Sequence, residues 1–211
     1  MKNNTSKTAF TGIAARLTLA CGLLQVALVL FSWIVSAVDV GLNVRSLLAS
    51  DGIRWFFGTF ATNVGGRVLV YVLLVCMACG AVAHSGLWSS LTSVFTLSKV
   101  SYRSHYALLT AFCIAILMCV CVAFLTFTPH GLLRSVTGDL FPSPFSFSLI
   151  PSLTFIIISS AVVYGLQSGG VSTIDDTFML FCHGLRFAIP IIPLYVVAIE
   201  LFHSVRFVFG W

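Results

Sequence analysis

Three residues near the carboxyl terminus have types and spacing suited to chemistry inside a membrane. Glu200, His203 and Arg206 follow one another at three-residue steps within an apolar run, so a helix would place them along one stripe. A carboxylate, an imidazole and a guanidinium in file can pass a proton or hold an anionic group near one membrane face. In a simpler interpretation, Arg206 extends to the interface and Glu200 is hydrated or paired with it. Both interpretations stay open at this point.

Other candidate groups favour structural roles. His84 lies near the end of an apolar run, where an interfacial hydrogen bond accounts for it. Asp175 and Asp176 follow Ser172 and Thr173 by three residues, which is the spacing of a helix capping box. This spacing predicts the start of a short helix.

The cysteines and the familiar catalytic motifs offer little chemistry. All seven cysteines lie in or beside apolar segments, without the loop spacing of a secreted disulfide framework. Cys76 and Cys79 would share a helix face, but they lack a second pair of ligands. The chain has no Walker loop, no His-Glu-x-x-His and no Gly-x-Ser-x-Gly elbow. We therefore expect no metal site, no cofactor and no catalytic residues, and we do not expect an enzyme.

The composition predicts an integral membrane protein. The mean hydropathy is +1.07. Hydrophobic residues make up 59% and charged residues 8% of the chain, whereas about a quarter of the residues in soluble domains are charged. The net charge of +5 is spread singly between apolar runs, so the expected partner is the lipid bilayer and not nucleic acid. Basic residues flank both sides of the runs almost equally, so charge does not set the orientation.

Five apolar runs are long enough to cross the bilayer as helices, which satisfy their own backbone hydrogen bonds. They cover residues 17–37, 68–88, 107–127, 147–166 and 187–209. The first run is longer than the core of a signal peptide, so we expect it to be retained. The predicted architecture is an all-α, polytopic transmembrane helical bundle that forms a single membrane domain over 1–211.

Residues 38–67, between the first two runs, mix aromatic and aliphatic side chains with Asp51, Arg54 and glycines. Such a segment suits the membrane interface, and an ordinary connecting loop with hydrophobic packing is the equally supported alternative. Arg67 marks the point where the chain enters the membrane again.

Small residues within the runs predict close helix packing. They give smooth faces on which membrane helices approach each other, because hydrocarbon supplies no hydrophobic drive for association. These residues are Ala78, Gly80, Ala81, Ala83, Ala161 and Gly165.

Two stretches resemble the p-aminobenzoyl-glutamate transporter family, AbgT, and together they cover well over half of the chain. Residues 47–91 are similar to the family's Leu-Leu-x-x-x-Gly-(Ile/Leu)-Arg-Trp entry and its following Gly-rich span. Residues 128–200 resemble its Pro-x-x-x-x-Leu-Arg linker, its Ser-Pro-Phe and Ile-Pro, and its Tyr-Gly-x-x-x-Gly before an acidic turn. The first match is carried by Gly52, Arg54, Trp55, Asn63 and residues 85–87.

The resemblance implies a secondary transporter of the bacterial inner membrane. Such a protein moves a small aromatic carboxylate or drug-like solute, coupled to protons or sodium, and family members resemble dimers. The chain departs from the family at two places. It lacks the block that holds the family's first re-entrant hairpin, and its residues 206–210 do not match the sequence motif of the family's second hairpin. Glu200 stands where the family usually has Gln, and His84 lies where an acidic residue is usual. The substrate-binding residues are therefore left unassigned.

Two functional hypotheses follow. The first is a shortened AbgT-type transporter, active alone or as a homo-oligomer, whose local support is the stripe of Glu200, His203 and Arg206. The second is a non-transporting membrane scaffold, or a subunit that complements a membrane partner, which kept the framework helices without the hairpins.

Overall fold

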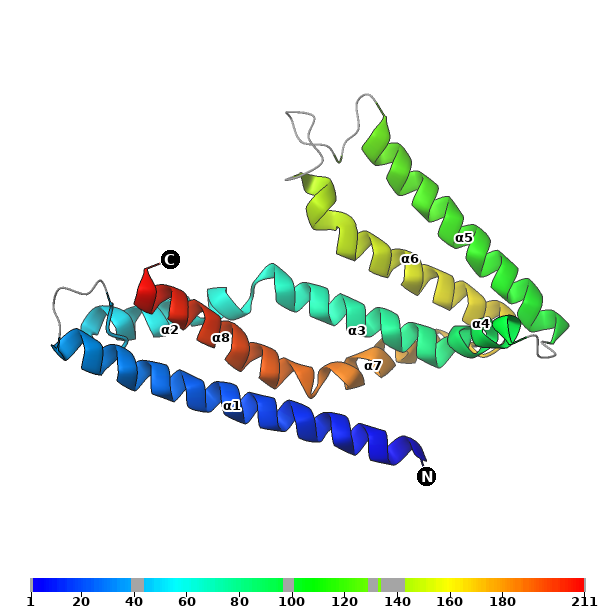
Figure 1. The fold of residues 1–211 in the computed structure, drawn as a ribbon. Helices are drawn as coiled ribbons and strands as arrows, with labels where there is room; N and C mark the ends of the chain where they lie inside the picture. The colour runs from blue at the N-terminus through cyan, green and yellow to red at the C-terminus, as the bar shows by residue number, and fades with distance from the viewer. Residues whose placement is uncertain (1, 39–43, 97–100, 129–132, 134–142, 211) are drawn as a thin grey trace. The chain divides into compact units, whose positions relative to one another are not determined.

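The computed structural model describes residues 2–38, 44–96, 101–128, 133 and 143–210. All regular structure among these residues is helical (Figure 1). The helices are α1 (Lys2–Val38), α2 (Ser50–Val64), α3 (Arg67–Ser85), α4 (Leu87–Phe95), α5 (Tyr102–Phe127), α6 (Pro144–Ser168), α7 (Ile174–Ala188) and α8 (Ile191–Phe209). The predicted all-α class is confirmed. The Pro-x-x-x-x-Leu-Arg linker lies, except for Leu133, outside the described residues.

Five stretches of the described chain are long and apolar enough to span a membrane, as the sequence predicts. They are Phe10–Val38, Ser50–Ser85, Tyr102–Phe127, Pro144–Ser168 and Ile191–Phe209. Their large side chains remain widely exposed, as expected where hydrocarbon surrounds the helices. The chain is a multi-pass membrane protein.

The second span differs from the expected run because a glycine interrupts it. The run was expected over 68–88, but α3 ends at Ser85. Gly86 adopts a left-handed conformation with φ of 79°, which has little steric cost for glycine alone. A separate helix, α4, begins at Leu87. At its other end, α3 begins at Arg67, the predicted point of entry.

The last span also begins later than expected, because two helices share the run over 187–209. Phe187 belongs to α7, and α8 begins at Ile191 after Pro190. Proline has no backbone N–H and its ring clashes with the preceding turn, so it favours a helix start over a helix interior. Pro190 therefore separates the two helices.

Within the segment after the first span, residues Ser50–Val64 form the helix α2. This part of the segment is therefore not an ordinary loop. Tyr195 on α8 donates a hydrogen bond to the backbone oxygen of Val64, at 3.1 Å, which ties the end of α2 to α8. Gly52 in its first turn lies against the preceding loop, where a Cβ atom would stand 2.6 Å from the Cα of Leu47. Its location at the membrane interface stays a prediction.

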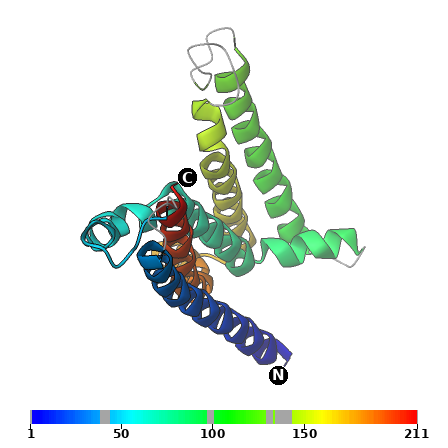
Figure 2. The same cartoon turned by 60° about the vertical axis from the view of Figure 1, so that its left-hand side comes forward.

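The helices group into two compact units, Met1–Val70 with Ala188–Trp211, and Tyr71–Phe187. In the first unit, α1 and α8 run side by side (Figures 1 and 2). Residues 44–49, which precede α2, are tied to both helices. The backbone N of Leu47 donates a hydrogen bond to Ser32 Oγ of α1 at 3.2 Å, and the backbone N of Arg45 donates one to the backbone oxygen of Val208 of α8 at 3.0 Å. That 1–211 forms a single membrane domain stays a prediction.

In the second unit, α5 and α6 pack as an antiparallel pair, with α4 beside them (Figures 1 and 2). Ser143 caps α6 by a reciprocal capping box with Ser146, and Pro144 occupies the first turn. This Ser-Pro pair is part of the Ser-Pro-Phe sequence noted above, and the structure gives it the role of starting a helix.

Pro151 lies inside α6 and leaves a backbone oxygen of that helix without its usual donor. The oxygen belongs to Phe147, four residues earlier, and Tyr71 at the start of α3 donates its hydroxyl to it at 2.9 Å. In hydrocarbon such a group must find a partner inside the protein. The Tyr71 hydroxyl supplies this partner, so the proline is accommodated by a contact between two helices.

The small residues named above are buried as the sequence predicts, except Ala83, which is exposed. Ala81 and Ala161 are fully buried in one core cluster with Val171 and Leu180. Gly80 of α3 meets Gly184 of α7 so closely that a Cβ atom on Gly80 would overlap the Gly184 backbone. The absence of side chains at both positions is therefore what allows α3 and α7 to cross.

The cap predicted before the last span is present at the start of α7. Asp176 Oδ2 accepts hydrogen bonds from the backbone N of Ser172 (3.1 Å) and of Thr173 (3.0 Å), and the Asp176 backbone N donates to Thr173 Oγ1 at 3.1 Å. These hydrogen bonds lower the pKa of Asp176 from 3.8 to about 2. Asp175 does not take part in this box and is exposed.

Replacing Gly80 by Ala should separate α3 from α7. We expect Gly80→Ala to lower the free energy of unfolding by about 1–3 kcal/mol, the usual cost of overpacking a core. The matched control is Gly22→Ala, since a Cβ atom at Gly22 would meet nothing within 4 Å. Unfolding in mixed micelles measures both variants. Equal stability of the two would contradict the close crossing.

Replacing Asp176 by Asn should weaken the start of α7 in a pH-dependent way. Because the folded pKa of about 2 lies below the ordinary 3.8, the carboxylate stabilises the fold above about pH 4, and this contribution is lost as the pH falls through 2. The unfolding temperature of Asp176→Asn should lie below that of the wild type at pH 7 and approach it near pH 2. Asp175→Asn serves as the control. If the unfolding temperature of Asp176→Asn were as far below that of the wild type at pH 2 as at pH 7, the account would be excluded.

Candidate functional site

The predicted stripe lies on α8, where the apolar run favours a helix and each polar residue follows the last by about one turn. Burial falls along it: Glu200 is 4% exposed, His203 is half-buried and Arg206 is exposed. Within the described part of the chain no ion pair joins Glu200 to Arg206. The pairing that the simpler interpretation allowed is therefore not formed, and Glu200 has a different partner.

That partner is Asn63 of α2. Its Nδ2 donates to Glu200 Oε2 at 3.4 Å and to Thr59 Oγ1, one turn earlier on α2, at 3.3 Å. The other carboxyl oxygen, Glu200 Oε1, is buried without a hydrogen-bond partner among the described residues. An ionised carboxylate with one long hydrogen bond is costly in a membrane span. The site therefore suits a carboxyl group that takes up a proton or faces a cation.

A second polar contact lies one turn further along α8. Gln25 of α1 donates its Nε2 to Ser204 Oγ at 2.8 Å, and Ser204 is fully buried. Gln25 Oε1, like Glu200 Oε1, is buried without a partner in the part of the chain that the structure describes. Three helices thus contribute to one polar layer, which consists of Gln25 from α1, Asn63 from α2, and Glu200 and Ser204 from α8.

Sequence reasoning missed the part that Gln25 and Ser204 play in this layer, and it noted Asn63 only for its resemblance to a family. The available signal was a lone amide inside the first apolar run. A polar residue there has to find a hydrogen-bond partner on a neighbouring helix. Which helix supplies the partner depends on tertiary packing.

An open cavity of about 310 Å³ lies at the outer end of the stripe. It is lined mainly by Arg45, Trp55, Asn63, His203, Arg206 and Phe207. The Trp55 and Phe207 rings stack with centroids 4.4 Å apart and an angle of 18° between their planes. The Arg45 guanidinium lies 5.9 Å from the Phe207 centroid, a cation–π distance. The cavity therefore combines cationic groups with an aromatic wall.

The stripe is divided between two environments. His203 and Arg206 line the cavity, whereas Glu200 does not, and Asn63 borders both because it also binds Glu200. The cavity can receive an anionic group, and the buried carboxyl can receive a proton or a cation. The role of each stripe residue stays a prediction.

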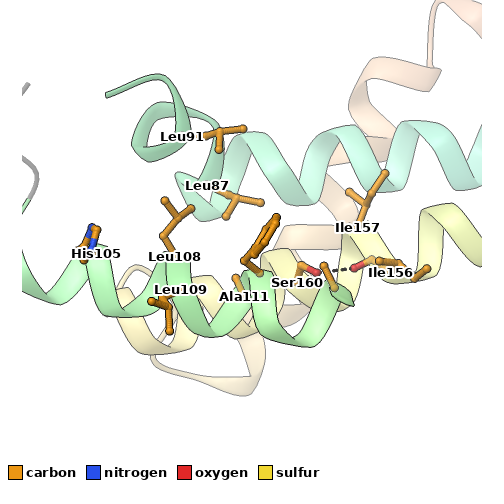
Figure 3. A pocket seen from close by; sticks show the side chains of 11 residues that line it. Leu87, Leu91, His105, Leu108, Leu109, Ala111, Ile156, Ile157 and Ser160 are labelled. Atoms are coloured by element: carbon orange, nitrogen blue, oxygen red, sulfur yellow. Dashed lines mark hydrogen bonds between the residues drawn. The ribbon is translucent and has the colours of Figure 1, made fainter. Parts of the chain in front are cut away.

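A larger cavity of about 490 Å³ lies between α4, α5 and α6 (Figure 3). Its walls are apolar apart from His105 and Ser160, and Ser160 Oγ donates back to the Ile156 backbone oxygen at 2.8 Å. Such a largely apolar space between membrane helices is suited to hydrocarbon.

The remaining candidates give no site. Among the described residues no group of three or more His, Cys, Asp and Glu side chains could hold a metal ion. Cys76 is buried and Cys79 is exposed on the same helix. His84 is exposed, and its ring contacts the ring of His183 with centroids 5.2 Å apart. This contact is a local one between α3 and α7.

No family model, curated protein or solved structure matches this chain.

The contact between Asn63 and Glu200 can be tested by a double-mutant cycle. The single variants Asn63→Ala and Glu200→Ala, each of which removes the hydrogen bond, and the double variant are unfolded in mixed micelles. We expect a coupling free energy of about 0.6–1.7 kcal/mol, the range measured for hydrogen bonds between membrane helices. The control cycle pairs Glu200→Ala with Thr110→Ala, since Thr110 of α5 lies in the other unit. A coupling no larger than in the control would contradict the contact.

Proposed function

We propose that this chain is a secondary, ion-coupled transporter of a small aromatic carboxylate or drug-like solute, related to the AbgT family. It would act in the inner membrane of bacteria, alone or as a homo-oligomer. The observation that carries the proposal is the Glu200 carboxyl, which is buried within a membrane span and has one oxygen without a partner among the residues that the structure describes.

Burying such a group has a free-energy cost that a leucine at the same position would avoid. A carboxyl that binds and releases a coupling ion supplies a reason for it. Asn63 supports this role, because an amide that donates to one oxygen leaves the other free for a proton or a cation. Glu200 is the coupling group of the proposal.

His203 and Arg206 extend the stripe from Glu200 towards the open cavity. An imidazole can exchange protons near neutral pH, so His203 is suited to relay a proton between the cavity and Glu200. Arg206, which keeps its charge, would hold the anionic counterpart near the mouth. The direction of transport and the solute site are not assigned.

The alternative is a non-transporting scaffold or partner subunit. It is favoured by the continuity of α1, α5 and α6, which are unbroken helices over 37, 26 and 25 residues. Transporter sites are typically built from unwound helices whose free backbone groups meet the substrate. In this hypothesis the polar layer holds the helices together and has no part in transport.

Transport is tested in proteoliposomes that contain the purified full-length chain. Uptake and efflux of labelled p-aminobenzoyl-glutamate are followed with an imposed proton gradient, an imposed sodium gradient and no gradient. Gradient-dependent flux above that of empty liposomes supports the transporter. Absence of flux from a folded sample under all three conditions favours the scaffold.

The variant Glu200→Gln tests the coupling group. Glutamine keeps the shape and the hydrogen bond to Asn63 but cannot bind a proton or offer a negative charge, so gradient-driven flux should fall at least tenfold. Asp175→Asn removes an exposed carboxylate at the start of α7 and should transport as the wild type does. Undiminished gradient-driven flux in Glu200→Gln would exclude Glu200 from coupling.

A further inference from the structure

The cavity at the end of α8 is lined by two arginines and by none of the acidic residues that the structure describes. Arg45 precedes α2, and Arg206 lies in the last turn of α8; both are exposed. Neither forms an ion pair within the described residues, and none of the described residues that line the cavity is acidic. With the His203 imidazole nearby, three side chains can provide hydrogen-bond donors at one place, whereas the Asn63 amide already donates to Glu200 and Thr59.

The cavity also lies at one end of two membrane spans. The first span ends at Val38 and the last at Phe209. The backbone hydrogen bond from Arg45 to Val208 fixes the loop after α1 beside the end of α8, so both spans reach the same membrane face here. At this depth the polar groups of lipids replace hydrocarbon, and phosphate is the main anion present.

We propose that this cavity binds the phosphate group of an anionic phospholipid. Guanidinium groups match phosphate oxygens with paired N–H donors, and two of them can share one phosphate. The His203 imidazole can supply a further donor to one of the remaining oxygens. The stacked Trp55 and Phe207 form the wall facing the glycerol region, where aromatic side chains are favoured.

The surfaces beside the cavity suit the acyl chains of such a lipid. Large apolar side chains are exposed near the ends of these two spans, with Phe31 and Ile34 of α1 at 51% and 53% and Phe209 of α8 at 42%. A soluble anion would use the arginines but leave these side chains without a role. The lipid accounts for the charged cavity and the apolar flank together.

The test measures lipid binding by the purified full-length chain. The unfolding temperature is followed in a neutral detergent during titration with short-chain phosphatidylglycerol, with phosphatidylcholine or with inorganic phosphate. We expect phosphatidylglycerol to raise the unfolding temperature of the wild type in a saturable manner, and the two other additions to leave it unchanged. In Arg45→Gln/Arg206→Gln the dissociation constant for phosphatidylglycerol should rise about tenfold or more.

The matched control is Arg16→Gln/Arg186→Gln, which removes the same charge from exposed positions outside the cavity and should bind as the wild type does. Because Arg45 also contacts Phe207, the single variant Arg206→Gln is measured as well, and it should lose several-fold in affinity while unfolding at the wild-type temperature without lipid.

Three outcomes would overturn the proposal. Equal affinity of the cavity and control double variants for phosphatidylglycerol would place the lipid elsewhere. Equal affinity of the wild type for phosphatidylcholine would remove the role of anionic charge. Inorganic phosphate that binds as tightly as the lipid would identify a soluble anion as the occupant. The measurement does not involve transport, so its failure and the failure of the transporter proposal are separate results.

Discussion

In hydrocarbon, a backbone N–H or C=O group must find its partner within the protein, and the rest of this structure depends on that constraint. It accounts for the helical form of every described span and for the places where helices stop. Gly86 and Pro190 end or separate helices because their backbones differ from those of other residues. Pro151 stays inside α6, and the Phe147 oxygen that loses its usual helix donor accepts a hydrogen bond from the Tyr71 hydroxyl. One helix interruption is thus converted into a contact between two helices.

Helices that already satisfy their backbones still need a reason to associate, and this chain uses two kinds of contact. In Tyr71–Phe187 the helices meet through small residues, such as Gly80 against Gly184, where close approach gains dispersion contacts. In the other unit α1, α2 and α8 are joined by hydrogen bonds from Gln25 and Asn63 to residues of α8. Contacts between small residues leave no space or polar group for a ligand. A polar layer can leave hydrogen-bonding atoms that are able to bind a proton or an ion.

In the unit formed by α1, α2 and α8, the acidic and basic side chains discussed above lie apart from each other. Among the described residues, Glu200 is buried with one unpartnered oxygen, and Arg45 and Arg206 are exposed around a cavity that no described acidic residue lines. Had Glu200 paired with Arg206, each charge would have satisfied the other and neither would have needed a ligand. Instead the carboxyl is suited to a cation or a proton and the guanidinium groups to an anion. This separation underlies both the transport and the lipid-binding proposals.

The sequence by itself determined the class of protein, the number of spans and the capped start of α7. The class and the spans follow from hydropathy over about 20 consecutive residues, and the cap follows from a pattern within about four residues. Both signals are local in the chain. It also placed Glu200, His203 and Arg206 on one helix. Only the tertiary structure decided that Asn63 binds Glu200, that Gln25 binds Ser204, and that Arg45 joins Arg206 at one cavity. Those contacts join residues that are far apart in the chain. The sequence could not predict them, because periodicity within one helix indicates which face a residue occupies but not which other helix packs against that face.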